Sequence, residues 1–172
     1  MLRTFILLIF ISIFLAGCGF HPRGATTLPE PLKKIFIKTA EPYSSLTRNI
    51  QNYLKLSGAH LTDSPEQART VLEIVNVSKY QVLTSISGTQ QTRQYDLILT
   101  AIFQVTDPQG RILIPQQSVS EKRTITIQAS QMLGSSNEAN AMYQQMQPAV
   151  VSDIMSRLSA DDVPQMLSKK YP

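Results

Sequence analysis

The only cysteine of the chain, Cys18, follows two small residues at the end of an apolar N-terminal segment. One basic residue, Arg3, precedes this segment, and residues 5–15 are apolar with a single serine among them. A signal peptidase accepts only small side chains beside the bond that it cuts, and Ala16 and Gly17 meet that requirement. A thiol directly after the cut can be alkylated with diacylglycerol. These residue types therefore predict lipid attachment at Cys18.

The sequence around Cys18 resembles the bacterial lipobox, in which the thiol is lipidated before cleavage and the new amino terminus is then acylated. The apolar segment has the length of a signal-peptide core and is shorter than the ~20 residues that span a bilayer. We expect a lipoprotein signal peptide at residues 1–17, cleavage between Gly17 and Cys18, and acyl chains such as palmitate on the mature protein. An ordinary secretory signal followed by an incidental free thiol is the alternative interpretation.

The residue after the cysteine, Gly19, bears on the destination of such a lipoprotein. By analogy with lipoprotein sorting in Gram-negative cells, the absence of aspartate at this position indicates the outer membrane. Each buried CH₂ group contributes about 0.8 kcal/mol, so two or more acyl chains hold a protein on a membrane. We therefore expect a lipid-anchored protein on the periplasmic side of the cell outer membrane.

Residues able to perform catalysis or to hold a cofactor form no recognisable pattern. The two histidines, His21 and His60, lack metal-ligand spacing, and the sequence has no nucleophile elbow, phosphate-binding loop or dinucleotide fingerprint. Glu73 and Asp96 fall on expected strand surfaces, where solvated charges are commoner than an acid–base pair. We therefore expect no enzymatic activity, no metal and no cofactor.

Few residues of the chain are charged, and most of its polar residues are neutral. Only 16% of the residues are charged and the formal net charge is +4, while Gln, Ser and Thr supply much of the polar character. The lysines and arginines are scattered, which argues against a nucleic-acid partner. A weakly charged, amide-rich surface suits a large permanent contact, because charge is depleted in the cores of such interfaces. Compositional drift explains the same observation equally well.

The sequence predicts a single α+β domain at residues 33–160, between a lipidated tether at 18–32 and a polar tail at 161–172. We expect a two-layer sandwich of about four mostly antiparallel strands with two main helices on one face. The order along the chain is strand, helix, three strands and helix. The strands are expected at residues 34–39, 71–82, 95–105 and 117–127, and the helices at 46–56 and 135–158.

Alternation gives the clearest side-chain directions in the sequence. From Tyr95 to Val105 every second residue is apolar and the intervening residues are largely polar, which predicts one core-facing side. Residues 85–91 contain Gly88 and predict a hairpin connection before this strand. Residues 107–110 predict a tight turn after it, because proline presets φ at the second position and glycine closes the bend.

Capping and breaking residues bound the two expected helices. A serine at position 44 or 45 is expected to cap the first helix, and Gly58 is expected to end it. Asn137 is the expected cap of the second helix. Pro148 lies inside that helix, where it removes a backbone donor and predicts either a kink or two helices meeting near Gln145.

Residues 18–24, CGFHPRG, resemble the mature N-terminus of the LPS-assembly lipoproteins of the LptE family, which typically begins with Cys-Gly-aromatic-His-Leu-Arg. Pro22 replaces the usual leucine, a departure confined to the tether. Gly58 after the first helix, Tyr95 after the hairpin and the limits of the last helix at 137–158 also fit the family. The resemblance extends over nearly the whole mature chain.

The resemblance implies an outer-membrane lipoprotein that plugs the LptD β-barrel in a 1:1 complex and helps to assemble it. It also implies assistance in inserting lipopolysaccharide into the outer leaflet. Lipopolysaccharide carries phosphates, so direct binding calls for arginine or lysine near an apolar surface. The candidate contacts are an uncharged hairpin tip and four basic residues, each of which is otherwise an ordinary surface residue. They are Ser87, Gly88, Thr89, Arg93, Lys79, Lys122 and Arg123.

Two other functions remain compatible with a lipobox. One is a free periplasm-facing carrier that holds a lipid or a lipoprotein in its own cavity, although four strands and two helices are few for such a hollow. The other is an auxiliary lipoprotein of a lipid-transporting ABC system. Co-purification of a large β-barrel, of nothing, or of an inner-membrane transporter distinguishes the three.

Overall fold

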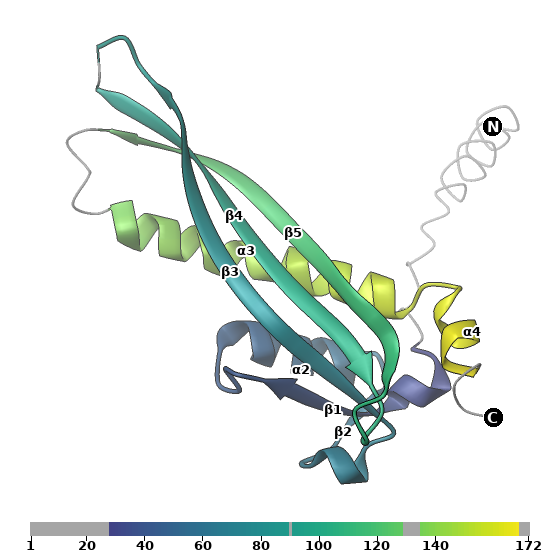
Figure 1. Cartoon of the computed structure of the whole chain (residues 1–172). Helices are drawn as coiled ribbons and strands as arrows, with labels where there is room; N and C mark the ends of the chain where they lie inside the picture. The colour runs from purple at the N-terminus through teal and green to yellow at the C-terminus, as the bar shows by residue number, and fades with distance from the viewer. Residues whose placement is uncertain (1–27, 90, 129–134, 169–172) are drawn as a thin grey trace, which may run out of the picture.

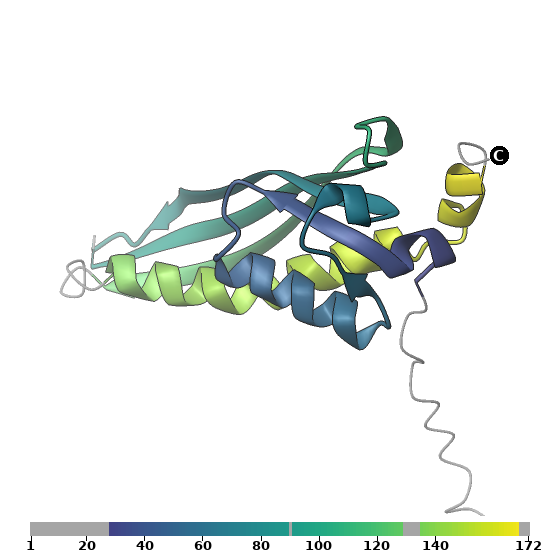
Figure 2. The same cartoon turned by 90° about the horizontal axis from the view of Figure 1, so that it is seen from below.

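The computed structural model describes residues 28–89, 91–128 and 135–168. Five strands form one sheet in the order β2-β1-β3-β4-β5, and the two main helices cover one face of it (Figure 1, Figure 2). This arrangement confirms the expected α+β class. The elements are η1 (Glu30–Lys33), β1 (Lys34–Thr39), α2 (Ser45–Leu56), β2 (His60–Leu61), η2 (Pro65–Gln67), β3 (Thr70–Ile86), β4 (Thr92–Thr106), β5 (Ile112–Gln128), α3 (Ser135–Leu158) and α4 (Val163–Ser168).

In the N-terminal part of the domain, α2 leads from β1 to β2, and both β2 and β3 pair in parallel with β1. Ser44 caps α2, since its hydroxyl accepts a hydrogen bond from the backbone N–H of Thr47 at 3.2 Å. Gly58 follows the helix with φ of 81°, a left-handed conformation that glycine adopts without strain. Both expected boundaries of this helix are confirmed.

The sheet contains one strand more than the sequence pattern predicts. His60 and Leu61 form β2, which pairs in parallel with β1 at the edge of the sheet. Two residues are too few to show alternation, so the strand is defined by its pairing and not by its composition. The sheet is therefore mixed, with parallel pairing around β1 and antiparallel pairing from β3 to β5.

The antiparallel strands β3, β4 and β5 form a long twisted ribbon (Figure 1). In β4 every second residue from Leu97 to Val105 is fully buried against the helices, which confirms the predicted side-chain directions. β3 extends to Ile86, four residues beyond the predicted end. Register shifts between Ile74 and Asn76 and between Leu83 and Ser85 mark irregularities in this strand.

The turn between β4 and β5 is built around the buried carboxylate of Asp107. Its Oδ1 accepts hydrogen bonds from the backbone N–H groups of Gln109 at 3.0 Å and Arg111 at 2.8 Å, and its Oδ2 accepts one from Arg111 Nε at 2.5 Å. Burial alone raises the pKa of Asp107, but these hydrogen bonds outweigh it and hold the pKa below its usual range. Gly110, with φ of 85°, completes the turn.

α3 is one continuous helix that contains Pro148, so the alternative of two helices meeting near Gln145 is wrong. Proline costs a helix about 3 kcal/mol. Packing offsets this cost here, because Met146 and Val150, on either side of the proline, are both fully buried. Asn137 is not the cap, because the helix already begins at Ser135.

The hydrophobic core extends beyond the boundaries expected at residues 33 and 160. Leu28 and Leu32, assigned to the tether, are buried with the core residues of the sheet and helices. Val163 and Leu167 of α4 are buried in the same cluster. Both ends of the described chain therefore pack on the domain.

Candidate functional site

The expected lipid attachment site, Cys18, and its neighbour Gly17 lie outside the described residues. Lipidation and cleavage at this position therefore remain predictions. Within the described part of the chain, no helix is both long enough and apolar enough to cross a membrane. The same residues contain no group of three or more His, Cys, Asp or Glu side chains that could hold a metal ion.

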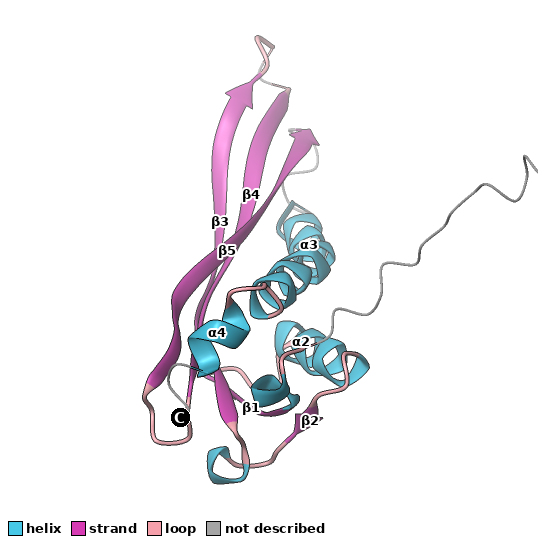
Figure 3. Ribbon diagram, turned by 90° about the vertical axis from the view of Figure 1, so that its right-hand side faces the viewer, coloured by secondary structure: helices cyan, strands magenta, loops and turns pink. Residues whose placement is uncertain are grey.

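The predicted tip residues Ser87, Gly88 and Thr89 lie at the far end of the ribbon, where the hairpin of β3 and β4 projects beyond the start of α3 (Figure 1, Figure 3). The backbone N–H of Ser87 donates to the carbonyl of Thr92 at 2.9 Å, and the N–H of Thr92 donates to the hydroxyl of Ser87 at 3.1 Å. These two bonds link the end of β3 to the start of β4 at the base of the turn.

Two of the four candidate basic residues are paired with carboxylates. Lys122 Nζ lies 3.2 Å from Asp96 Oδ2, and Arg123 Nε lies 3.2 Å from Glu121 Oε1. Hydrogen bonds from Thr124 and Lys122 lower the pKa of Asp96, so it is ionised at neutral pH. Because their charges are already balanced locally, Lys122 and Arg123 are the weaker candidates for binding a phosphate.

Lys79 instead lies over an aromatic ring. Its ammonium is 5.6 Å from the ring centre of Tyr143 in α3, within the range of a cation–π contact. The Tyr143 hydroxyl donates to the backbone carbonyl of Tyr80 at 2.7 Å, and burial raises the pKa of this phenol. The phenol is therefore protonated and ties α3 to β3.

Arg93 has the least satisfied side chain of the candidates. It lies in β4 between Ile86 of β3 and Ile127 of β5, close to the hairpin tip. Its Nε is buried and makes no hydrogen bond with the described residues. No described carboxylate lies within ion-pairing distance of Arg93 or Lys79.

The strand register shows which candidates lie together. Paired residues of neighbouring strands share a face, and Lys79, Arg93 and Arg123 are paired with Leu99, Ile127 and Leu97 of the helix-covered face. Lys122 is paired with Ile98 on the opposite face. The ribbon therefore brings three cationic side chains to the side of α3 and separates the fourth from them.

Apolar residues along β3 were missed by the sequence analysis as a possible contact surface. Beyond Ile74 this strand carries six exposed large apolar side chains on its two faces and at its bulge. They are Val75, Val77, Tyr80, Val82, Leu83 and Ile86. The available signal was the run from residue 80 to residue 92, which contains no charged residue.

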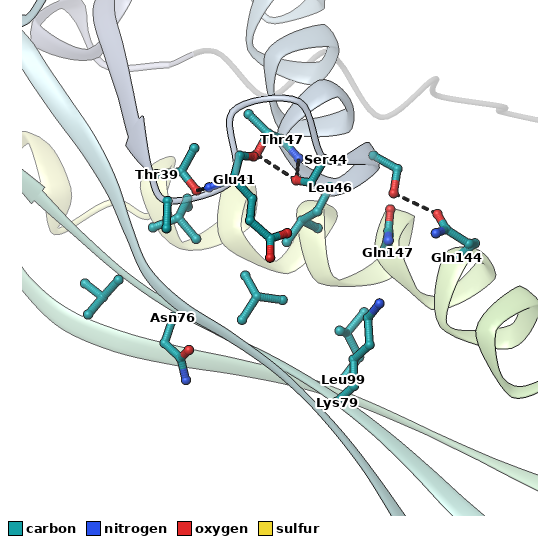
Figure 4. Close-up of a pocket in the computed structure, with 15 residues that line it drawn as sticks. Thr39, Glu41, Ser44, Leu46, Thr47, Asn76, Lys79, Leu99, Gln144 and Gln147 are labelled. Atoms are coloured by element: carbon teal, nitrogen blue, oxygen red, sulfur yellow. Dashed lines mark hydrogen bonds between the residues drawn. The ribbon is translucent and has the colours of Figure 1, made fainter. Parts of the chain in front are cut away.

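A groove opens beside the first part of this exposed strand segment (Figure 4). Its volume is about 390 Å³, and its walls come from the end of β1, the start of α2, β3 and α3. Glu41 and Lys79 reach it from different sides, and Gln144 and Gln147 line it from α3. The Ser45 hydroxyl donates to Gln144 Oε1 at 2.8 Å and joins the two helices at its rim.

The sequence profile of the LptE family, described as lipopolysaccharide-assembly, matches residues 32–158. The chain belongs to the LptE family. The matched segment begins within η1 and ends with the last residue of α3, so it includes the whole sheet and both main helices.

Curated relatives in this family carry the name LPS-assembly lipoprotein LptE. The one from Yersinia enterocolitica is 31% identical over 158 residues, which cover 91% of this chain and 75% of the relative. The one from Pectobacterium atrosepticum is 29% identical over 158 residues, which cover 91% of this chain and 85% of the relative.

Solved structures of bacterial lipoproteins share the fold. Lipoprotein B of Nitrosomonas europaea superimposes with a TM-score of 0.68 at 18% identity, over 89% of this chain and 97% of that protein. A minor lipoprotein of Acinetobacter baumannii gives a TM-score of 0.62 at 19% identity, over 76% of this chain and 92% of that protein. Identities this low support the fold alone.

Proposed function

We propose that this member of the LptE family is an outer-membrane lipoprotein that plugs the LptD β-barrel, helps to assemble it and assists the insertion of lipopolysaccharide into the outer leaflet. The family match and the names of the curated relatives support the role in lipopolysaccharide assembly. The lipid anchor at Cys18 would place the protein at the periplasmic side of that membrane.

The observation that carries the plug proposal is the projecting, uncharged hairpin. The lumen of a β-barrel is polar and water-filled, so a segment that enters it should expose hydroxyl and amide groups and few unpaired charges. Ser87 and Thr89 at the tip fit this requirement, and the ribbon holds them beyond the helices (Figure 3).

Arg93 is the residue that we expect to meet an anion near the tip. A buried guanidinium nitrogen without a partner lowers stability, and the Nε of Arg93 has none among the described residues. Such an arrangement is expected of a group that finds its partner only in the assembled complex. A phosphate of lipopolysaccharide or an acidic side chain of the barrel wall would provide the missing acceptor. Lys79 shares this face and would add to its positive potential.

Site-specific photocrosslinking in intact cells tests the plug proposal. Crosslinkers at Ser87 or Thr89 should capture the LptD barrel. A crosslinker at Gln109, in the turn at the opposite end of the ribbon, should capture it less. Capture at Gln109 with none at the tip would reverse the proposed orientation. Purification that recovers an inner-membrane transporter instead of the barrel would favour the ABC-system alternative.

A further inference from the structure

The edge of β3 is open over its second half. β1 pairs with β3 only as far as Ile74, and beyond it β3 has a strand neighbour on one side alone, β4, among the residues that the structure describes. An open edge exposes backbone N–H and C=O groups that can pair with another strand. Residues 75–86 therefore present a template for one more strand in the position that β1 leaves at Thr39.

The two long edges of the ribbon differ in their side chains. The outer strand β5 carries Pro115, Glu121, Lys122 and Arg123, residue types that discourage the addition of a strand. Beyond Ile74, β3 has no proline and a single charged residue, Lys79. This half of β3 therefore carries fewer of the residues that discourage strand addition than β5 does, so its open edge is suited to binding another strand.

Two contacts limit the part of this edge that can receive a partner. At one end the chain leaves β1 after Thr39 and turns into α2. At the other end the Tyr143 hydroxyl already occupies the carbonyl of Tyr80. Between them lie residues 75–79, and the groove described above opens along them (Figure 4). We call this segment and its groove the edge slot.

The lining of the edge slot defines what fits it. Its apolar wall includes Leu46 and Leu99, and its polar wall includes Gln147, which is only 4% exposed and accepts a 3.4 Å hydrogen bond from Asn49 Nδ2. One carboxylate and one ammonium line it, those of Glu41 and Lys79, so the lining carries no net charge. An acyl chain could fill the groove but could not pair with the backbone of β3. An extended, uncharged polypeptide can do both.

We propose that the edge slot binds an extended, uncharged segment of the partner barrel, which adds a strand to β3 along residues 75–79 and places one uncharged side chain in the groove. The identity of the partner rests on the proposed function, because the LptD barrel is taken as the source of the added strand. It assigns a contact by strand addition on the side of the domain, distinct from the contact made by the hairpin tip.

Hydrogen–deuterium exchange tests the proposal on the full lipidated chain in detergent, alone and in its purified complex with LptD. Those amides of residues 75–79 that point away from β4 should exchange rapidly in the free protein and about tenfold or more slowly in the complex, because an added strand engages edge N–H groups that the free protein leaves open. Residues 116–120 on the outer edge of β5 provide the internal control and should change little.

A pair of variants adds a second measurement. Val75→Asp places a charge in the edge slot, whereas Ile112→Asp places one on β5, and the two side chains are similarly exposed at 46% and 49%. Val75→Asp should lower the yield of purified complex about tenfold and remove the protection of residues 75–79, while Ile112→Asp should leave both unchanged. Equal effects of the two variants would overturn the proposal.

The remaining outcomes separate this inference from the proposed function. If the complex forms and residues 75–79 exchange as fast as in the free protein, the edge slot proposal is wrong and the plug proposal stands. If no complex with LptD forms at all, the proposed function fails. Protection by lipopolysaccharide alone, or protection that rises with the concentration of the free protein, would assign the slot to a lipid or to a second copy and overturn the proposal.

Discussion

Replacing Arg93 by methionine should separate function from stability. The Arg93 Nε is buried and has no hydrogen-bond partner among the described residues, and an unsatisfied buried polar group costs roughly 1–3 kcal/mol. Methionine keeps a flexible apolar stem that can pack between Ile86 and Ile127. We therefore expect Arg93→Met to leave the free energy of unfolding unchanged or to raise it by about 1 kcal/mol. The same change should weaken lipopolysaccharide binding or assembly of the barrel.

Urea denaturation of the purified protein and the antibiotic permeability of cells that depend on the variant measure the two effects. Arg123→Met is the matched control, since it removes one positive charge from the same face, where the arginine is exposed and paired with Glu121. Arg93→Asp, which reverses the charge, should impair the permeability barrier more strongly than Arg93→Met. A loss of more than about 1 kcal/mol in Arg93→Met together with a normal barrier would show that Arg93 is structural.

Three further predictions concern the core, the turn and the anchor. Phe103→Ala should cost about 2–5 kcal/mol by opening a cavity, whereas Thr100→Ala, on the opposite face, should cost little; denaturant midpoints in the reverse order would refute the strand register. Asp107→Asn should cost roughly 1–3 kcal/mol at neutral pH. The pKa of Asp107 is lowered in the folded protein. The stability that this carboxylate contributes is therefore complete above its unfolded pKa of about 3.9 and declines as the pH falls through its folded pKa. Urea midpoints of wild type and Asp107→Asn should therefore converge in acid. Cys18→Ala should abolish incorporation of radiolabelled palmitate, and equal labelling of wild type and variant would falsify the anchor assignment.

The elements that the sequence predicted best are those whose patterns report burial directly. Alternation in β4 identified its core face, because every second residue there packs against a helix. Gly58 marked the end of α2, because its left-handed backbone requires glycine. The second half of β3 was predicted too short, because exposed strand residues need no alternation and their pairing with β4 defines them. Of the two outcomes expected at Pro148, the break into two helices was wrong, because tertiary packing holds the helix intact across the proline.

The candidate site was less predictable than the fold. Sequence reasoning named four basic residues but could not rank them, since their partners lie on other elements. Lys122 meets Asp96 across neighbouring strands, and Lys79 meets Tyr143 of α3, 64 positions later in the chain. Neither contact leaves a mark in local composition. The edge slot was missed for the same reason, because an open edge depends on where β1 ends in space.

The length of the ribbon determines how far the hairpin tip lies from the helix-covered end of the domain. β3, β4 and β5 contain 17, 15 and 17 residues, and at about 3.3 Å per residue a strand of this size extends roughly 50 Å. The hydrocarbon layer of a bilayer is about 30 Å thick. If the domain sits at the periplasmic mouth of a barrel as proposed, the ribbon is long enough to carry its hairpin tip to the level of the outer leaflet while α2 remains in the periplasm. In that geometry the length of the strands sets the depth that the tip reaches, and removing matched residue pairs from β3, β4 and β5 would lower that depth.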